Sequence, residues 1–198
     1  MDGAAREGGR RRKLGGVPNL PNVITVIRVL LVPVIAYLLV EGRYAPALAV
    51  FMAAAFSDFA DGAIARHYRM VSEFGARLDP IADKLTMFTA TILLAWQSWL
   101  PLWLAAAMVL RDVVFAGGAI AYRLVVGHVE MQPTWLSKVN TALEFAVLAG
   151  VLAQAADLVD GREWLPSLFV VVFATVILSG AQYVWAWSRK AVAARRGA

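Results

Sequence analysis

The sequence contains no cysteine and only two histidines in 198 residues. The absence of cysteine excludes disulfide bonds, metal sites built from thiolates, and cysteine nucleophiles. Charged residues are also scarce, at 17% of the chain, against about 25% in an average soluble domain. Such a composition is untypical of a soluble enzyme, and it excludes an intrinsically disordered chain.

Apolar residues are abundant instead. They make up 60% of the chain, and the mean hydropathy is +0.64. Because a helix needs about 20 apolar residues to cross a membrane, six crossings would use about 120 residues, close to what this chain offers. We therefore expect an all-α integral membrane protein with six transmembrane helices in one compact domain and no second domain.

The apolar runs also give approximate limits for these helices. Pro101 interrupts the uncharged stretch 85–110, which predicts a tight hairpin at that point. Tryptophans recur near the expected helix ends, as they do in the aromatic belts of membrane proteins. The expected helices run from about 19 to 39, 44 to 66, 78 to 99, 101 to 122, 138 to 156 and 164 to 187.

The first expected helix begins with a segment of mixed polarity. Pro21 suits the first turn of a helix, and Asn22, Thr25 and Arg28 recur at every third position, roughly on one helix face. We expect this segment to form an N-terminal interfacial helix that continues into the first span. A signal peptide is the alternative, but the apolar run is long and no small-residue cleavage site follows it.

Basic residues are distributed unevenly around the membrane domain, 19–188. We expect residues 1–18, which include five arginines and lysines, to form a flexible arm, and residues 189–198 to form a basic tail. The expected loops on the opposite side carry only Arg43 and Arg162, so the positive-inside rule places both termini in the cytoplasm. A basic arm could bind nucleic acid, but we favour attraction to anionic lipids and expect no nucleic-acid partner.

Four aspartates lie within the second and third expected helices. Asp58 and Asp61 are three residues apart, and Asp79 and Asp83 are four apart, so each pair lies on one helix face. A helical hairpin would bring the two faces together just inside the cytoplasmic boundary. Ionisable residues in a span cost about 2.5–3.5 kcal/mol each on insertion scales, so they indicate function.

Four carboxylates that converge at low dielectric repel one another unless protons or cations neutralise them. Oxygen ligands without histidine or cysteine favour hard divalent cations such as Mg²⁺ or Mn²⁺, and paired metals of this kind serve phosphoryl chemistry. The alternative is that the aspartates cap helix ends or pair with nearby basic residues. That alternative explains any one of them more easily than all four together. The basic residues concerned are Arg66, Arg69, Arg77 and Lys84.

The residues between the aspartates leave space for a ligand. Gly62, Ala63 and Ala65 keep the helix surface small, and Arg66, one turn beyond Gly62, could hold a diphosphate. Gly75 is expected in the connecting loop, where a positive φ could be needed. Small residues also pack spanning helices against one another, so these positions alone do not identify a site.

Together these residues form a string of eight fixed positions over 26 residues. The string is Asp58-x2-Asp61-Gly62-x2-Ala65-Arg66-x8-Gly75-x3-Asp79-x3-Asp83. At every fixed position it resembles the signature of the CDP-alcohol phosphatidyltransferases. The segment 19–33, which contains Pro-Asn-x2-Thr-x2-Arg, also resembles the start of the bacterial members. The resemblance extends over most of the chain, the arm and the tail excepted.

The resemblance implies a six-helix membrane fold, usually a homodimer, whose site opens to the cytoplasm. It implies two divalent metal ions, Mg²⁺ or Mn²⁺, and transfer of a phosphatidyl group from CDP-diacylglycerol to an alcohol with release of CMP. By the same resemblance, Asp58, Asp61 and Asp79 would be metal ligands, and Asp83 a ligand and the general base. The CDP-lipid would be bound by Asn22, Thr25, Arg28, Gly62, Ala65, Arg66 and Gly75.

The acceptor alcohol has to be inferred from the rest of the chain. Phosphatidylglycerophosphate synthases usually show Arg-Glu in the fourth helix and Lys-x-Lys-Thr at the start of the fifth, where two cations suit the nearly doubly charged glycerol 3-phosphate. This chain has Arg111-Asp112 at the first place, and Lys138 followed by the neutral Asn140 at the second. The pattern resembles the CMP-forming cardiolipin synthases, whose acceptor is phosphatidylglycerol, a phosphodiester of single charge.

We therefore expect Arg111, Lys138 and Asn140 to contact the acceptor, and we favour cardiolipin synthesis over phosphatidylglycerophosphate synthesis. A simple ion pair between Asp112 and Arg111, and a loop position for Lys138, are the alternatives. Inositol phosphate and serine are less favoured acceptors on overall resemblance. Glu144, in the fifth helix, could bind Arg111, contact the acceptor or face a dimer partner.

A cation or proton transporter is the alternative from another class, because acidic residues inside membranes also mark ion pathways. Transporters more often spread these residues across the membrane or repeat them in two halves. Here they cluster at one depth, and the sequence has no internal repeat. We expect an enzyme of the bacterial cytoplasmic membrane, although the residues alone are also compatible with the mitochondrial inner membrane.

Overall fold

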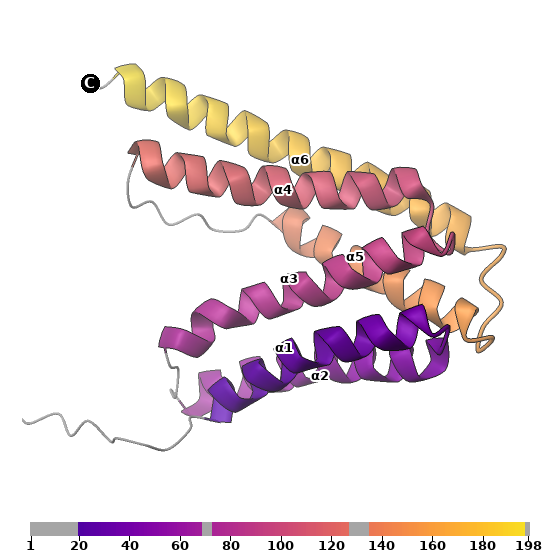
Figure 1. Ribbon diagram of the computed structural model, residues 1–198. Coiled ribbons are helices and arrows are strands. Elements are labelled where there is room, and N and C mark those ends of the chain that lie inside the picture. Colours follow the sequence, from indigo (N-terminus) through magenta and orange to yellow (C-terminus); the bar gives the residue numbers. More distant parts are fainter. Residues whose placement is uncertain (1–19, 69–72, 127–134, 197–198) are drawn as a thin grey trace, which may run out of the picture.

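The computed structural model describes the backbone of residues 20–68, 73–126 and 135–196 (Figure 1), and the side chains of residues 27–57, 84–118, 135–183 and 185. Within these ranges the chain is all-helical and forms six α-helices. They are α1 (Leu20–Val40), α2 (Tyr44–Tyr68), α3 (Glu73–Trp96), α4 (Leu102–Val126), α5 (Trp135–Ala155) and α6 (Leu165–Arg196).

These helices confirm the six that were expected, and their bounds differ most at the start of α3 and the end of α6. Helix α3 begins at Glu73 rather than near Leu78, so Gly75 is helical and not in a loop. The expectation of a positive φ at Gly75 is therefore wrong. The helix can begin at Glu73 because an acidic residue interacts favourably with the dipole at a helix N-terminus. It can include Gly75 because one glycine destabilises a helix by only about 1 kcal/mol. Helix α6 continues to Arg196 because its last turns contain alanine and arginine, which are strong helix formers.

Tight turns join α1 to α2 and α3 to α4. Gly42, with φ of 68°, follows α1, and its amide donates to the carbonyl of Leu39 at 3.0 Å. Glycine adopts this left-handed conformation without steric cost, which is why it commonly ends helices. Ser98, with φ of 64°, has the same role after α3. The carbonyl of Pro101 accepts from the amide of Leu104 at 3.0 Å and begins α4, which confirms the predicted hairpin.

The helices form two groups, which are connected by α5 and by a contact between α3 and α4. In the described parts, α1 packs against both α2 and α3, while α4 packs against α6. Figure 1 shows α4 and α6 side by side above α1, α2 and α3, with α5 crossing between the two groups. Helix α5 contacts α2 and α3 on one side and α6 on the other. Polar residues on its different faces therefore meet different surroundings.

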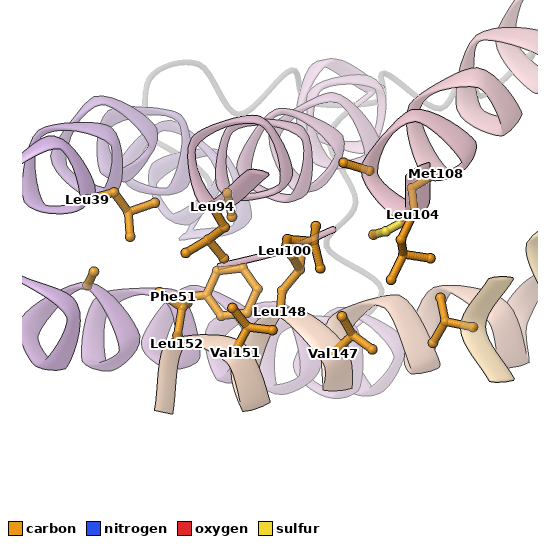
Figure 2. Close-up of a cluster of buried hydrophobic side chains, with 14 of the residues drawn as sticks. Leu39, Phe51, Leu94, Leu100, Leu104, Met108, Val147, Leu148, Val151 and Leu152 are labelled. Atoms are coloured by element: carbon orange, nitrogen blue, oxygen red, sulfur yellow. The ribbon is translucent and has the colours of Figure 1, made fainter. Parts of the chain in front are cut away.

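Apolar side chains fill the bundle near the two tight turns. Figure 2 shows Leu39, Phe51 and Leu94 close to Val151 and Leu152 of α5. Phe51 also stacks on Phe145, with 4.9 Å between the ring centroids. Close packing of this kind stabilises helix association inside a membrane, where lipid is as apolar as the side chains themselves.

Among the described residues, two segments are long and apolar enough to cross a membrane, Trp135–Ala155 and Leu165–Tyr183. The described parts of three other helices are shorter apolar segments, Ile27–Val40, Tyr44–Ser57 and Lys84–Trp96. The outer surface carries many exposed large apolar side chains, as a membrane protein requires.

Candidate active site

The four aspartates lie on the helices where they were expected. Asp58 and Asp61 are on α2, and Asp79 and Asp83 are on α3. The structure describes the backbone of both helices at these positions, but the aspartate side chains lie outside the described residues. The same holds for six other predicted site residues, whose roles stay predictions. They are Asn22, Thr25, Gly62, Ala65, Arg66 and Gly75.

A cavity of about 490 Å³ lies between α1, α2, α3 and α5. Apolar side chains form most of its wall, and two cations and two hydroxyl groups are also present. The described lining residues are Arg28, Phe51, Ala54, Ala55, Thr86, Met87, Lys138, Thr141, Ala142 and Phe145.

The cavity lies one helical turn from the aspartate positions. Ala54 of its lining is four residues before Asp58 on α2, and Met87 of its lining is four residues after Asp83 on α3. Residues four apart share a helix face. The next turn of each face, towards the ends that residues 69–72 connect, therefore carries an aspartate. The cavity and the aspartate positions form one continuous strip along two helices.

Arg28 and Lys138 bring two separate predictions into one cavity. Arg28, predicted to bind the CDP-lipid, lines the cavity from α1 and is only 2% exposed. Lys138, predicted to contact the acceptor, lines it from the first turns of α5 and is exposed. Two cations in a mainly apolar cavity suit a ligand that combines a phosphate group with hydrocarbon.

Sequence reasoning missed the two hydroxyl groups of this cavity. Thr86 lines it from α3, three residues after Asp83, and Thr141 lines it from α5, three residues after Lys138. The Thr141 hydroxyl donates to the carbonyl of Ser137 at 3.1 Å. Their spacing from predicted site residues was a signal that could have identified both, because residues three apart lie close on a helix surface.

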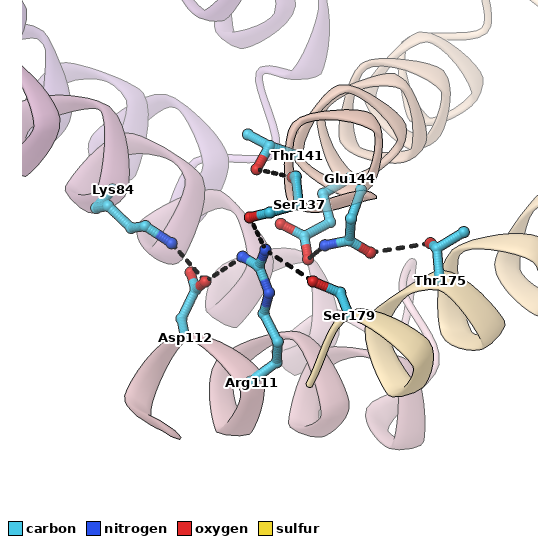
Figure 3. Close-up of polar contacts among 9 residues, drawn as sticks. Lys84, Arg111, Asp112, Ser137, Thr141, Glu144, Thr175 and Ser179 are labelled. Atoms are coloured by element: carbon cyan, nitrogen blue, oxygen red, sulfur yellow. Dashed lines mark hydrogen bonds and ion pairs between the residues drawn. The ribbon is translucent and has the colours of Figure 1, made fainter. Parts of the chain in front are cut away.

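Arg111 lies outside the cavity and binds residues of three helices. Its guanidinium donates to Asp112 Oδ1 at 2.8 Å, to Ser137 Oγ of α5 at 2.8 Å and to Ser179 Oγ of α6 at 3.5 Å (Figure 3). Its side chain is only 5% exposed. An arginine in this arrangement ties α4 to its neighbours, so its placement does not support the expected contact with the acceptor.

Asn140 is also directed away from the cavity. It is fully buried, its amide nitrogen donates to Glu144 Oε1 at 2.6 Å, and its carbonyl oxygen accepts from the Thr175 hydroxyl at 2.9 Å. Glu144, for which the sequence suggested three roles, accepts a hydrogen bond from Asn140 and is buried. The structure thus places Asn140 in a contact between helices and only Lys138 in the cavity.

Asp112 pairs with two cations at once. Its Oδ1 accepts from Arg111 and also from Lys84 Nζ of α3 (Figure 3). The simple pairing of Asp112 with Arg111, considered from the sequence as an alternative, is therefore present. The partner from α3 was not foreseen, because the two residues are 28 positions apart in the chain.

The donor set of the four aspartates suits a hard divalent cation. Carboxylate oxygens without histidine or cysteine select Mg²⁺ or Mn²⁺ rather than zinc or copper. In the part of the chain with described side chains, no group of three or more acidic or histidine residues could hold a metal. The aspartates of α2 and α3 thus remain the candidate ligands.

Residues 18–187 match the profile of the CDP-alcohol phosphatidyltransferases. The chain belongs to this family. The matched range includes all eight signature residues as well as Arg28 and Lys138. Family membership and the apolar helices together identify a membrane protein.

Individual relatives carry two different names. The chain is 35% identical over 179 residues to a fusion protein of CMP-forming cardiolipin synthase and a mitochondrial hydrolase from Schizosaccharomyces pombe, covering 83% of this chain and 30% of that protein. It is 31% identical to a CMP-forming cardiolipin synthase from Homo sapiens, covering 68% of this chain and 50% of that protein.

A bacterial relative has the other name. The chain is 30% identical over 174 residues to a CDP-diacylglycerol–glycerol-3-phosphate 3-phosphatidyltransferase from Sodalis glossinidius, covering 85% of this chain and 94% of that protein. The chain spans half or less of the two eukaryotic relatives and nearly all of the bacterial one. The sequence identities to the two kinds of relative are too similar to decide which acceptor this chain uses.

Proposed function

We propose that this protein transfers a phosphatidyl group from CDP-diacylglycerol to phosphatidylglycerol, which forms cardiolipin and releases CMP. The observation that carries this proposal is the continuous strip in which a cavity with Arg28 and Lys138 lies one turn from the Asp58 and Asp83 positions. One end of the strip suits a phosphate attached to a lipid, and the other end carries the signature of the family.

The residues divide the reaction between them. Arg28 and Lys138 would bind lipid phosphate by charge-assisted hydrogen bonds, and the apolar wall near Phe51 and Phe145 would face hydrocarbon. Asp83 would accept the proton of the acceptor hydroxyl. That hydroxyl oxygen would then bond to the phosphorus that carries diacylglycerol, as the bond from this phosphorus to the CMP oxygen breaks. Positioning and electrostatics would supply most of the rate.

A metal pair would be held by Asp58, Asp61, Asp79 and Asp83. When bound, divalent ions would supply neutralisation of the diphosphate and stabilisation of CMP as leaving group. Gly62, Ala65, Arg66 and Gly75, with Asn22 and Thr25 of α1, are proposed to hold the rest of the CDP-lipid. The position of Thr25 supports its part in this assignment, because Thr25 is one turn before Arg28 on α1 and residues three apart are neighbours on a helix surface.

The choice of phosphatidylglycerol rests on the charge and polarity of the cavity. Arg28 is assigned to the CDP-lipid, so Lys138 is the cation among the described lining residues that is left for the acceptor, and most of the other lining side chains are apolar. A phosphodiester lipid has one negative charge and glycerol groups attached to hydrocarbon, which fits such a wall. Glycerol 3-phosphate is the second candidate, because the relative from Sodalis glossinidius is named for that acceptor.

The arrangement of helix ends supports the proposed topology of six spans with cytoplasmic termini. The start of α1, the end of α2, the start of α3 and the end of α6 lie at the same side of the bundle in Figure 1. The basic arm 1–18 precedes the start of α1, and the basic tail 189–198 includes the end of α6. We propose a homodimer in a bacterial cytoplasmic membrane, with the arm 1–18 and the tail 189–198 on the cytoplasmic side.

The test is CMP release by purified protein with CDP-diacylglycerol and Mg²⁺ or Mn²⁺. Phosphatidylglycerol and glycerol 3-phosphate are supplied in parallel, and products are identified by mass. We expect release with phosphatidylglycerol and formation of cardiolipin. Release with glycerol 3-phosphate alone would show that the acceptor is wrong while the donor chemistry stands. Without release for either acceptor, the proposed reaction would be rejected.

A further inference from the structure

Lys84 is held outside the cavity by a residue of another helix. It follows Asp83 directly on α3, and its ammonium donates to Asp112 Oδ1 of α4. Its side chain is 48% exposed, so packing does not immobilise it. Asp112 is the only hydrogen-bond partner that the structure describes for Lys84, and Lys84 is not among the described residues that line the cavity.

The position of Lys84 on α3 is close to the cavity face. Met87, three residues further along, lines the cavity, and residues three apart are neighbours on a helix surface. A lysine has a flexible four-carbon stem. Without an anion on α4, the same ammonium could therefore turn towards the cavity that Met87 lines.

Asp112 itself is held in a fixed place. Arg111 contacts the same Oδ1 at 2.8 Å, and the Arg111 guanidinium is bound to Ser137 and Ser179 at its other nitrogen. The carboxylate is therefore attached to a buried network that joins α4, α5 and α6. The flexible Lys84 side chain is therefore retained by a carboxylate whose own position is fixed.

We propose that Asp112 determines acceptor selectivity by keeping Lys84 out of the cavity. This inference rests on the proposed phosphatidyl transfer and deepens it. With Lys84 retained on α4 and Arg28 assigned to the CDP-lipid, Lys138 is the one cation of the described lining that is left for the phosphate of the acceptor, and one cation suits a phosphodiester. A released Lys84 would add a second cation and favour a phosphomonoester, which has nearly two charges. Asp112 is a specificity-determining residue that acts through Lys84.

The experiment compares kcat/KM for glycerol 3-phosphate with kcat/KM for phosphatidylglycerol in purified full-length protein. Asp112→Asn keeps the shape of the side chain and removes the charge that retains Lys84. We expect the ratio to shift about tenfold towards glycerol 3-phosphate, which equals about 1.4 kcal/mol. Asp112→Glu keeps the charge and should leave the ratio within twofold of the unmodified protein.

Lys84 variants separate this role from a merely structural one. Lys84→Gln alone should leave the ratio within twofold, because the ammonium is already outside the cavity. Lys84→Gln combined with Asp112→Asn should return the ratio to that of the unmodified protein. A shift that persists in the double variant, or a tenfold loss of glycerol 3-phosphate use in Lys84→Gln alone, would overturn the proposal.

A binding measurement tests Asp112 independently of turnover. The affinity for glycerol 3-phosphate is measured from the rise of the melting temperature with ligand concentration in detergent. We expect about tenfold tighter binding in Asp112→Asn, and no such gain in the double variant. Equal binding in all variants would overturn the role of Asp112. If the unmodified protein released no CMP, the proposed reaction would fail while this measurement still decided the charge effect.

Discussion

The two faces of α5 carry polar residues of similar kinds in different surroundings. On one face, Lys138 and Thr141 line a cavity and are exposed. On the other face, Ser137, Asn140 and Glu144 are buried and bonded to residues of α4, α5 or α6. Neighbours in the sequence therefore belong to different functions, because each residue turns a helix by about 100°.

This difference separates ligand binding from helix association. The buried face satisfies its polar groups within the protein, and in a membrane such bonds hold helices together. The cavity face leaves Lys138 available to a ligand. Changes on the cavity strip should therefore alter activity more than stability, and changes on the buried face should do the reverse.

The largest effect is expected at Asp83, in the part of the strip that carries the aspartates. Asp83→Asn is nearly isosteric but cannot accept the proton of the acceptor, so turnover should fall by at least about a hundredfold. Binding of CDP-diacylglycerol should stay largely intact. CMP release and equilibrium lipid binding are measured side by side.

Asp157→Asn is the matched control for this variant. Asp157 is exposed in the turn after α5, with φ of 56°, a conformation that asparagine also tolerates. Its substitution should change neither turnover nor lipid binding. Near-normal turnover in Asp83→Asn would contradict the assignment of Asp83 as the general base.

The next effect concerns the buried face. Asn140→Ala removes the bond to Thr175 and leaves Glu144 without the donor that it has at 2.6 Å. The loss of stability should be about 1–3 kcal/mol, the cost of an unsatisfied buried group. The measurement is the melting temperature in detergent, together with KM for the acceptor, which should stay within twofold.

Thr141→Ala is the matching substitution on the cavity face of the same helix. Because Thr141 is exposed, its loss should leave the melting temperature nearly unchanged. If Asn140→Ala instead raised KM for the acceptor while the protein melted normally, Asn140 would contact the acceptor as the sequence alone suggested. The comparison between the two faces would then be wrong.

A smaller effect is expected at the cation of the cavity face. Lys138→Gln should lower kcat/KM for phosphatidylglycerol about tenfold, or about 1.4 kcal/mol, because one cation of the cavity is lost. The melting temperature should not change, since Lys138 is exposed. Lys138→Arg should restore most of the activity. An unchanged kcat/KM in Lys138→Gln would mean that Lys138 does not contact the acceptor.

The smallest effect is expected for a single bond of the buried face. Thr175→Val keeps the side-chain volume and removes the hydroxyl that donates to Asn140 at 2.9 Å. Hydrogen bonds between membrane helices average about 0.6 kcal/mol, so the melting temperature should fall slightly and kcat should stay the same. A larger loss in Thr175→Val than in Asn140→Ala would show that Glu144 does not depend on Asn140.

Much of the fold could be predicted from local patterns. Apolar runs located all six helices, and Pro101 located the turn before α4, because both signals act over a few residues. The start of α3 was misjudged at Gly75, since a glycine between helices predicts a loop although a helix can include it at small cost. The apolar runs also predicted correctly that two of the aspartates lie on α2 and two on α3.

The acceptor residues show where prediction from sequence ended. Arg111, Lys138 and Asn140 were grouped by their charge and their place in the chain, but only Lys138 lines the cavity. The sequence by itself determined the membrane class, the family and the candidate ligands, because these depend on composition and short spacings. Only the tertiary structure decided which polar residues bind one another, since the side of a helix that meets a neighbour depends on how distant helices pack. Lys84 and Asp112 meet 28 positions apart for that reason.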